Sequence, residues 1–157
     1  MSTGAWFLVV TLALAAAFGG YRALTDGTFR GTRRVGYGRV TRKLPGSQDA
    51  SSAPVVASVV EGTPWVDDLG EQFTLLQFSS AFCAPCRATR RVLGEVVEVV
   101  PGVAHIEVDA EQHLDVVRRL GILRTPTTLI LDSAGAEITR ATGAPTKQQV
   151  LGALGAA

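Results

Sequence analysis

The sequence has few cysteines and histidines and little net charge, which argues against several common classes of protein. It contains two cysteines and two histidines, and its formal net charge is +1. A net charge so close to zero gives no indication of nucleic-acid binding. A four-ligand zinc site needs two ligands beyond a pair of cysteines, and His105 and His113 are too far apart for the usual H-x₃₋₅-H spacing. The length of 157 residues allows one domain of ordinary size with additional segments.

Charged side chains are also absent from residues 1–21. About 20 apolar residues cross the hydrocarbon core of a bilayer as a helix, and Trp6 and Tyr21 stand near the ends of this segment, where interfacial aromatic residues are expected. A cleaved signal peptide is the alternative, because Ala15–Ala17 can mimic a cleavage site. Signal peptides begin with a basic region, however, and the first four residues contain no Lys or Arg. We therefore predict a retained transmembrane anchor over residues 1–21.

Residues 22–54 are rich in Gly, Ser, Thr and Arg, and no hydrophobic period persists in them. We predict a flexible linker. Asp26 is the single acid in the part of the linker before position 44, and all the basic residues lie in that part: Arg22, Arg30, Arg33, Arg34, Arg39, Arg42 and Lys43. The positive-inside rule then favours a single-pass membrane protein whose catalytic domain is cytoplasmic, with the extracytoplasmic side as the alternative. The basic half of the linker either contacts anionic membrane lipid or is a solvated tether.

The two cysteines, Cys83 and Cys86, form a C-x-x-C motif between a strand-like run and a helix-like run. A cysteine at the first turn of a helix faces unpaired N–H groups and the positive end of the helix dipole, which favour the thiolate. Such thiols have pKa values of roughly 3.5–7.5, against about 8.5 for a free thiol. Cys86 lies one turn later and can attack a mixed disulfide at Cys83, and Pro85 is tolerated in a first turn. The motif predicts a redox-active dithiol; half of a zinc site and an inert pair are the alternatives.

Two segments of the chain are similar to parts of a known family. Gln77–Arg87 resembles the strand–turn–helix active site of thioredoxins, and Gly121–Thr127 resembles their G-I-x-x-x-P-T segment, whose proline is cis. Asp132–Gly135 resembles the turn that follows, and Gly143–Ala144 resembles the glycine near the last helix. The resemblance covers about residues 55–155 and implies a thioredoxin fold and thiol–disulfide exchange.

The resemblance also implies roles for individual residues. It makes Cys83 and Cys86 the catalytic, disulfide-forming pair and places the substrate beside them, with no metal and no cofactor. The residues that it assigns to substrate binding are Phe82, Ala84, Pro85, Thr125, Pro126, Gly143 and Ala144. Without the resemblance, Pro126 reads simply as a proline at the start of a strand. The implied partners are proteins with disulfides or dithiols and an upstream electron donor, either a thioredoxin-reductase-like protein or a membrane dithiol transporter.

Several positions depart from the thioredoxin pattern. Phe82 and Ala84 replace the usual Trp and Gly, and Ser79 replaces another Trp. Gln77 stands where thioredoxins carry a buried Asp, and His105 stands where its Lys partner is found. Gln cannot accept a proton, whereas His titrates near neutrality. His105 is therefore a candidate for proton transfer, with a purely structural histidine as the alternative. The direction of the redox reaction stays open, because potentials in this fold span roughly −270 to −120 mV.

Hydrophobic periodicity predicts a mixed central sheet with helices on both faces over residues 55–157, in the order βαβαβαββα. Strands are expected at 55–60, 73–79, 103–109, 127–131 and 137–141. Helices are expected at 83–100, from about 111 to 121, and at 146–154, with a short helix or turn at 64–69. Thr146 is the expected cap of the last helix, and the residues expected to face the core from the first are Ala88, Val92, Leu93, Val96 and Val100. Three functions fit these features: a membrane-tethered thiol–disulfide oxidoreductase, an electron-relay or redox-sensing partner of a membrane protein, and a non-catalytic binding module.

Overall fold

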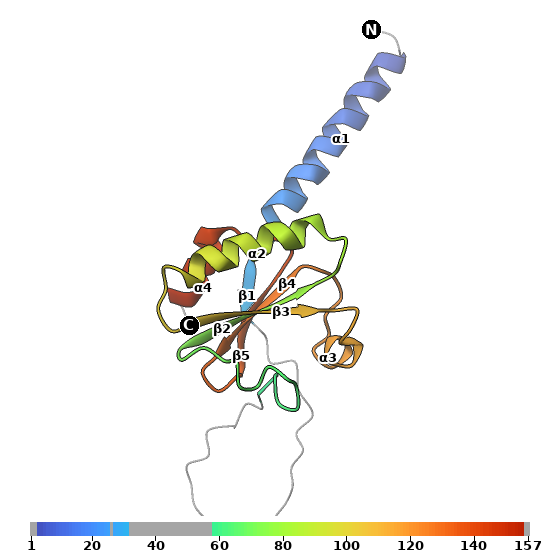
Figure 1. Cartoon of the computed structure of the whole chain (residues 1–157). Coiled ribbons are helices and arrows are strands. Elements are labelled where there is room, and N and C mark those ends of the chain that lie inside the picture. The colour runs from blue at the N-terminus through green and yellow to red at the C-terminus, as the bar shows by residue number, and fades with distance from the viewer. Residues whose placement is uncertain (1–2, 26, 32–57, 156–157) are drawn as a thin grey trace, which may run out of the picture.

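The computed structural model describes residues 3–25, 27–31 and 58–155, and it consists of a long helix projecting from an α/β domain (Figure 1). The domain is built on one five-stranded sheet. Its strands are β1 (Phe29–Gly31), β2 (Phe73–Ser79), β3 (Val103–Asp109), β4 (Thr127–Asp132) and β5 (Glu137–Thr142). The helices are α1 (Thr3–Thr25), α2 (Ala84–Val97), α3 (Leu114–Arg119) and α4 (Lys147–Gly155).

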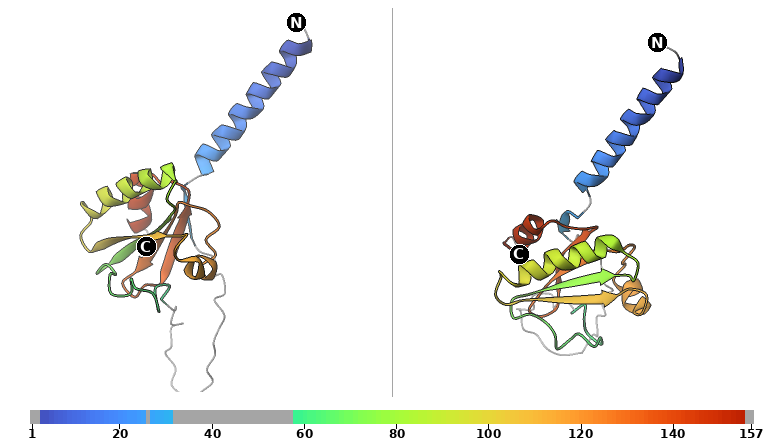
Figure 2. Two further views of the ribbon diagram at one scale, coloured as in Figure 1. Left: turned by 45° about the vertical axis from the view of Figure 1, so that its right-hand side comes forward. Right: turned by 45° about the horizontal axis from the view of Figure 1, so that its top comes forward.

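The sheet is mixed and is covered on both faces, as the sequence predicts. The strand order is β1-β5-β4-β2-β3, in which β2 and β3 run parallel and the other neighbours run antiparallel. Successive side chains of a strand point to opposite faces, so Leu75 packs with α2 and α4, whereas Leu76 packs with α3 and the segment around Val60. Figure 2 shows α2 and α4 together on one side of the sheet. The central strand β2 is therefore buried on both faces and positions the residues that follow it.

Helix α1 contains a stretch, Gly4–Tyr21, that is long and apolar enough to cross a membrane. Its mean hydropathy is 1.7 and none of it is buried against the domain. A signal sequence has the same length and composition. The helix continues past the predicted end at Tyr21 as far as Thr25.

Strand β1 corrects the prediction of a linker over residues 22–54. Residues 22–25 belong to α1, and Phe29–Gly31 pairs antiparallel with β5, with Phe29 opposite Ala141. Without β1, strand β5 would present an unpaired edge, and three residues are enough to cover part of it. Residues 26 and 32–54 of the predicted linker lie outside the described part of the chain.

The predicted first strand at 55–60 is also wrong in its described part, because residues 58–60 form no strand and a turn begins at residue 59. Val60 is nevertheless 1% exposed and packs into the core with Leu76 and Leu131, and the N–H of Val59 donates to the carbonyl oxygen of Gly135. The apolar run is thus buried as a loop. Residues 55–57 lie outside the described residues.

The helices are shorter than predicted. Helix α2 ends at Val97, with Thr89 buried where Ala88 was expected. Helix α3 has six residues, and residues 64–67 form a turn. The expected cap of α4 is present: the Thr146 hydroxyl accepts the N–H of Gln149, whose side-chain oxygen accepts the N–H of Thr146. This reciprocal pair is a capping box.

Candidate active site

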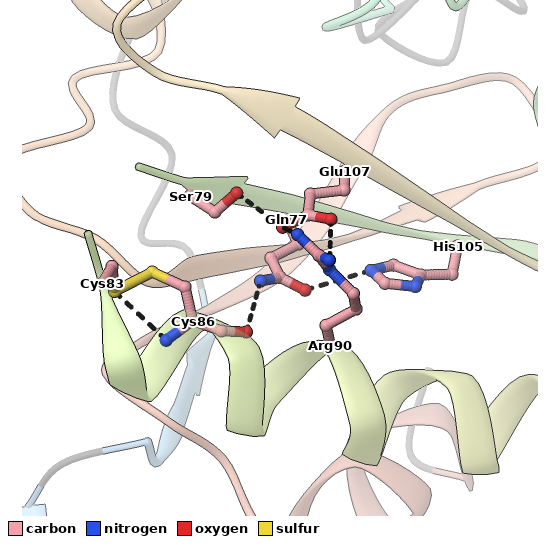
Figure 3. Close-up of polar contacts among 7 residues, drawn as sticks. All are labelled: Gln77, Ser79, Cys83, Cys86, Arg90, His105 and Glu107. Atoms are coloured by element: carbon pink, nitrogen blue, oxygen red, sulfur yellow. Dashed lines mark hydrogen bonds and ion pairs between the residues drawn. A yellow bond between two sulfur atoms is a disulfide. The ribbon is translucent and has the colours of Figure 1, made fainter. Parts of the chain in front are cut away.

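Cys83 and Cys86 lie where β2 passes into α2, and they form a disulfide with Cα atoms 5.2 Å apart (Figure 3). Cys83 is the N-cap of α2, and its N–H donates to the carbonyl oxygen of Ser80, which closes the turn that follows the strand. Cys83 is half-buried, whereas Cys86 is 2% exposed. A substrate sulfur can therefore reach Cys83 directly, while Cys86 is enclosed within the first turn of the helix.

The sulfur of Cys83 occupies the position that an N-cap oxygen usually takes. The backbone N–H of Cys86 donates to this sulfur at a distance of 3.1 Å. An N-cap acceptor stabilises a helix by satisfying an otherwise unpaired N–H, and the same N–H stabilises negative charge on the acceptor. This contact supplies the geometry for the low thiol pKa that the sequence predicts at Cys83.

Gln77, which stands in place of the expected buried acid, holds Cys86 through the backbone. It is 0% exposed, and its Nε2 donates to the carbonyl oxygen of Cys86 at 3.0 Å. Its Oε1 lies 3.1 Å from Nε2 of His105. A backbone carbonyl can only accept, so the amide nitrogen of Gln77 faces Cys86, and His105 must donate to the amide oxygen. The proton of neutral His105 is therefore on Nε2.

The environment of His105 favours its neutral form. Burial lowers the pKa of His105 and the charge of Arg90 lowers it further, while the carboxylate of Glu107 acts in the opposite direction without reversing the shift. Figure 3 shows Gln77 between His105 and Cys86. The structure thus brings Gln77 into contact with Cys86 and His105 into contact with Gln77. His105 is connected to Cys86 only through an amide, which is a poor proton carrier.

A second polar cluster beside the disulfide was not predicted from the sequence. Glu107 accepts a hydrogen bond from the Ser79 hydroxyl at 2.6 Å and pairs with both Nε and Nη2 of Arg90. Burial alone raises the pKa of Glu107, but the hydrogen bonds from Arg90 and Ser79 and the charges of Arg90 and His105 together lower it. The carboxylate therefore stays ionised and paired at neutral pH.

This cluster borders a hollow of about 410 Å³ whose wall includes both cysteines. Arg87, Arg90, Glu107 and Asp109 supply the charged part of the wall. Two signals in the sequence were available to find them. Arg87 and Arg90 follow Cys83 at i+4 and i+7 on one helical face, and Glu107 and Asp109 lie two residues apart on one face of β3.

Three loops meet at the active-site turn. The Thr125–Pro126 peptide bond is cis, as the resemblance implies. Thr125 lies 3.2 Å from Ser80, oxygen to oxygen, and the carbonyl oxygen of Pro126 accepts the N–H of Gly143 at 2.8 Å. Pro126 is buried, whereas Phe82, Ala84, Pro85 and Ala144 are exposed. Phe82 is 96% exposed. Leu123, an apolar residue that the sequence analysis did not assign to the site, is 95% exposed.

Residues 57–155 match the family model for thioredoxin. The chain belongs to the thioredoxin family. It is 30% identical over 81 residues to thioredoxin-2 of Pyricularia oryzae, a match that covers 51% of this chain and 47% of that protein. Among solved structures, the thioredoxin of Fasciola hepatica superposes with a TM-score of 0.53 at 18% identity, covering 64% of this chain and 95% of the other. Chloroplastic thioredoxin z gives a TM-score of 0.51 at 23% identity, covering 59% and 82%. These two similarities show the fold.

The departures from the thioredoxin pattern gather around one end of this thioredoxin domain. Gln77 and His105 contact each other, and Ser79 binds the carboxylate of Glu107 on the neighbouring strand. Among the described residues, no three His, Cys, Asp or Glu side chains gather in a way that could hold a metal ion. The site can therefore supply a dithiol, a hydrogen-bonded backbone around Cys86 and an ion pair next to the hollow.

Proposed function

We propose that this protein is a membrane-tethered thiol–disulfide oxidoreductase that reduces or exchanges disulfides of protein substrates through Cys83 and Cys86. The observation that carries the proposal is the pairing of an accessible N-cap cysteine with an enclosed cysteine one turn later. The family supports the same chemistry. The enclosed position of Cys86 suits a residue that reacts only within the protein.

The reaction transfers two electrons and two protons. The Cys83 thiolate attacks one sulfur of a substrate disulfide, forming a mixed disulfide and releasing the other substrate sulfur as a thiolate, which takes up a proton. Cys86 then loses its proton and attacks the Cys83 sulfur. The second substrate sulfur leaves and is protonated, and the Cys83–Cys86 disulfide remains. Oxidation of a substrate dithiol runs these steps in reverse. An upstream dithiol donor, either a thioredoxin-reductase-like protein or a membrane dithiol transporter, returns the pair to its reduced form.

The three loops beside Cys83 suit an extended substrate. We assign the backbone of Thr125 and Pro126 to the floor of the groove, because this segment contacts the active-site loop at Ser80 and the loop at Gly143. The exposed Phe82, Ala84 and Pro85 contribute apolar surface on one side, with Gly143 and Ala144 on the other. Apolar walls with backbone acceptors at the base bind peptides of varied sequence.

Proton transfer at Cys86 is assigned to solvent in the hollow, with Gln77 and His105 as positioning residues. The hollow is lined in part by Cys86 and by charged side chains, so it suits water. Gln77 holds the backbone of Cys86, and His105 holds Gln77. A direct role for His105 would require the Gln77 amide to move aside.

We assign α1 as the membrane anchor and place the domain on the cytoplasmic side. Support for the anchor comes from the apolar Gly4–Tyr21 stretch, which is not buried against the domain. Support for the side comes from the basic residues between positions 22 and 43.

Insulin reduction by the detergent-solubilised full chain, with dithiothreitol as the donor, tests the activity. We expect turnover by the native chain and none by Cys83→Ser, with a far-ultraviolet circular dichroism spectrum that matches in both. Equal activity of the two would refute the proposal. A topology reporter fused after Ala157 tests the side of the membrane.

A further inference from the structure

The anchor helix joins the domain at the end of the sheet that carries the cysteines. Phe29 of β1 pairs with Ala141 of β5, and Ala141 pairs with Thr128 of β4. Thr128 in turn pairs with Gln77 of β2, whose side chain holds Cys86. The chain therefore enters the sheet in the same row as Gln77, so α1 leaves from the active-site end. Figures 1 and 2 show α1 projecting from the side of the domain where α2 begins.

Gly27, two residues before β1, packs directly on the rim of the proposed substrate groove. Its N–H donates to the carbonyl oxygen of Thr142 at 2.9 Å. Gly27 is buried with a φ of +75°, and a Cβ at this position would overlap the carbonyl of Ala144 and the Cα of Pro145. Only glycine fits such a close approach at a positive φ. The connection between α1 and the groove is therefore a packed contact.

The length of this connection fixes how far the groove can be from the bilayer. Tyr21 ends the candidate membrane span, and the helix continues to Thr25, which adds about 6 Å at 1.5 Å per residue. The next two residues, up to Gly27, reach at most about 7 Å. The groove rim is then within about 13 Å of the hydrocarbon core, and the headgroup layer takes up roughly 5–8 Å of this. A flexible linker over residues 22–54 would instead allow an average reach of roughly 30 Å.

We propose that the redox partner of Cys83 is an integral membrane protein that presents a disulfide or dithiol at the bilayer surface, on the side of the domain. A small folded domain is about 30 Å across, which is too large for the space between the rim and the headgroups. A cysteine pair of an integral membrane protein at the bilayer surface, by contrast, already lies in the headgroup layer. The exposed Phe82, next to Cys83 in the chain, and Leu123, three residues before Pro126, provide apolar contact surface for it. This partner rests on the proposed function, since it exchanges two electrons with the Cys83–Cys86 pair.

Two insertions of the same 20-residue Gly-Ser segment test the geometry. Insertion between Asp26 and Gly27 lengthens the chain between α1 and the sheet, whereas insertion between Ser51 and Ser52 lies after β1. Each is made in the Cys86→Ser full chain, labelled on Cys83 with a maleimide fluorophore and reconstituted into phosphatidylcholine vesicles with acceptor dye on the lipid headgroups. We expect strong energy transfer without insertion and with the insertion after Ser51, and weak transfer with the insertion after Asp26. Equal transfer for the two insertions, or weak transfer without any insertion, would overturn the proposal.

Activity of the unlabelled chain with both cysteines separates this inference from the proposed function. One substrate is a transmembrane peptide with a disulfide loop at the headgroup level, and the other is oxidised glutathione in solution. We expect the insertion after Asp26 to slow reduction of the anchored peptide by roughly tenfold, by lowering the effective concentration of the dithiol, and to leave glutathione reduction unchanged. Loss of activity toward both substrates in every chain would contradict the oxidoreductase function. Equal rates for the anchored peptide with and without the insertion would contradict the partner alone.

Discussion

Gln77 donates its side-chain amide to the backbone carbonyl oxygen of Cys86 at a distance of 3.0 Å. This bond joins the central strand to the first turn of α2 directly behind the disulfide. Because the amide is neutral, it holds Cys86 without the large cost of burying a charge. The same amide receives a hydrogen bond from the half-buried His105, so the backbone of Cys86, Gln77 and His105 form one chain of hydrogen bonds. The consequence is a well-positioned cysteine with an amide, and not an acid, at position 77 behind it.

The first prediction concerns the roles of the two cysteines. Cys86→Ser should accumulate mixed disulfides through Cys83, because the half-buried sulfur can still attack a substrate but nothing releases it. Cys83→Ser should accumulate none, since Cys86 is 2% exposed. Non-reducing electrophoresis with a disulfide peptide measures the trapped species. Trapping by Cys83→Ser alone would reverse the assignment.

A second prediction concerns stability below neutral pH. Burial lowers the pKa of His105 in the folded state from an ordinary value of 6.5. The unfolded chain therefore binds more protons than the folded chain once the pH falls below about 6.5, and the free energy of unfolding should decrease as the pH is lowered from 7.5 to 5.5. One such group contributes at most about 1.4 kcal/mol per pH unit.

The test compares the native chain with His105→Gln by urea unfolding at both pH values. His105→Gln should show a smaller loss of stability on acidification than the native chain. An unchanged dependence in His105→Gln would show that another group is responsible.

The third prediction tests the packing of β1 on the groove rim. Gly27 and Gly62 both have positive φ, +75° and +73°, but a Cβ at Gly62 would meet no atom within 4 Å. Alanine at either position costs about 1–2 kcal/mol because it must adopt a left-handed backbone conformation. Only at Gly27 must the added Cβ also displace the backbone of Ala144 and Pro145. We expect Gly27→Ala to increase hydrogen exchange of the β5 amides in the full chain and Gly62→Ala to leave it unchanged. Equal protection in both variants would mean that β1 does not hold this edge.

A fourth prediction concerns the ion pair that borders the hollow. Arg90 and Glu107 carry opposite charges and line the same hollow as Cys83, so Arg90→Gln should raise the pKa of the Cys83 thiol and Glu107→Gln should lower it. The side chain of Arg90 is 58% exposed, so screening by solvent keeps each shift small. Alkylation rates of the reduced chains against pH measure the shifts, and 1 M salt should shrink both. Shifts in the same direction would exclude an electrostatic cause.

Much of the fold could be predicted because its signals are local. The apolar run at 73–79 and the helical spacing that follows it give β2 and α2 directly, and the cysteines lie at their junction. Strand β1 could not be predicted in this way, because three residues carry no period and their pairing depends on an edge of β5 some 110 residues later. The strand predicted around Val60 was wrong for a different reason. An apolar run is expected both for a buried loop and for a paired strand, so the sequence does not distinguish the two.

The candidate site also has parts that could be predicted from the sequence and parts that could not. Cys83, Cys86 and the cis bond before Pro126 were predicted from motifs, and the structure confirms their geometry. The cluster of Ser79, Arg90 and Glu107 requires the register between β2 and β3 together with the rotation of α2 over them. Neither the strand register nor the rotation of α2 can be predicted from one segment alone.

The last prediction concerns the proton of Cys86. With Gln77 behind it, Cys86 has no buried base, so release of the mixed disulfide should be slow below neutral pH. Gln77→Asp introduces a carboxylate, and Gln77→Asn introduces a side chain of the same size that cannot ionise. Both shorter side chains lose the hydrogen bond to Cys86 and should destabilise the fold, by about 1–3 kcal/mol. Burial should raise the pKa of the new carboxyl toward the range of an effective base, so only Gln77→Asp should release the mixed disulfide faster near pH 7. Single-turnover rates against pH for the native chain, both variants and His105→Ala measure this. Identical profiles in all four would show that neither position 77 nor His105 affects the proton, and that water in the hollow beside Cys86 suffices.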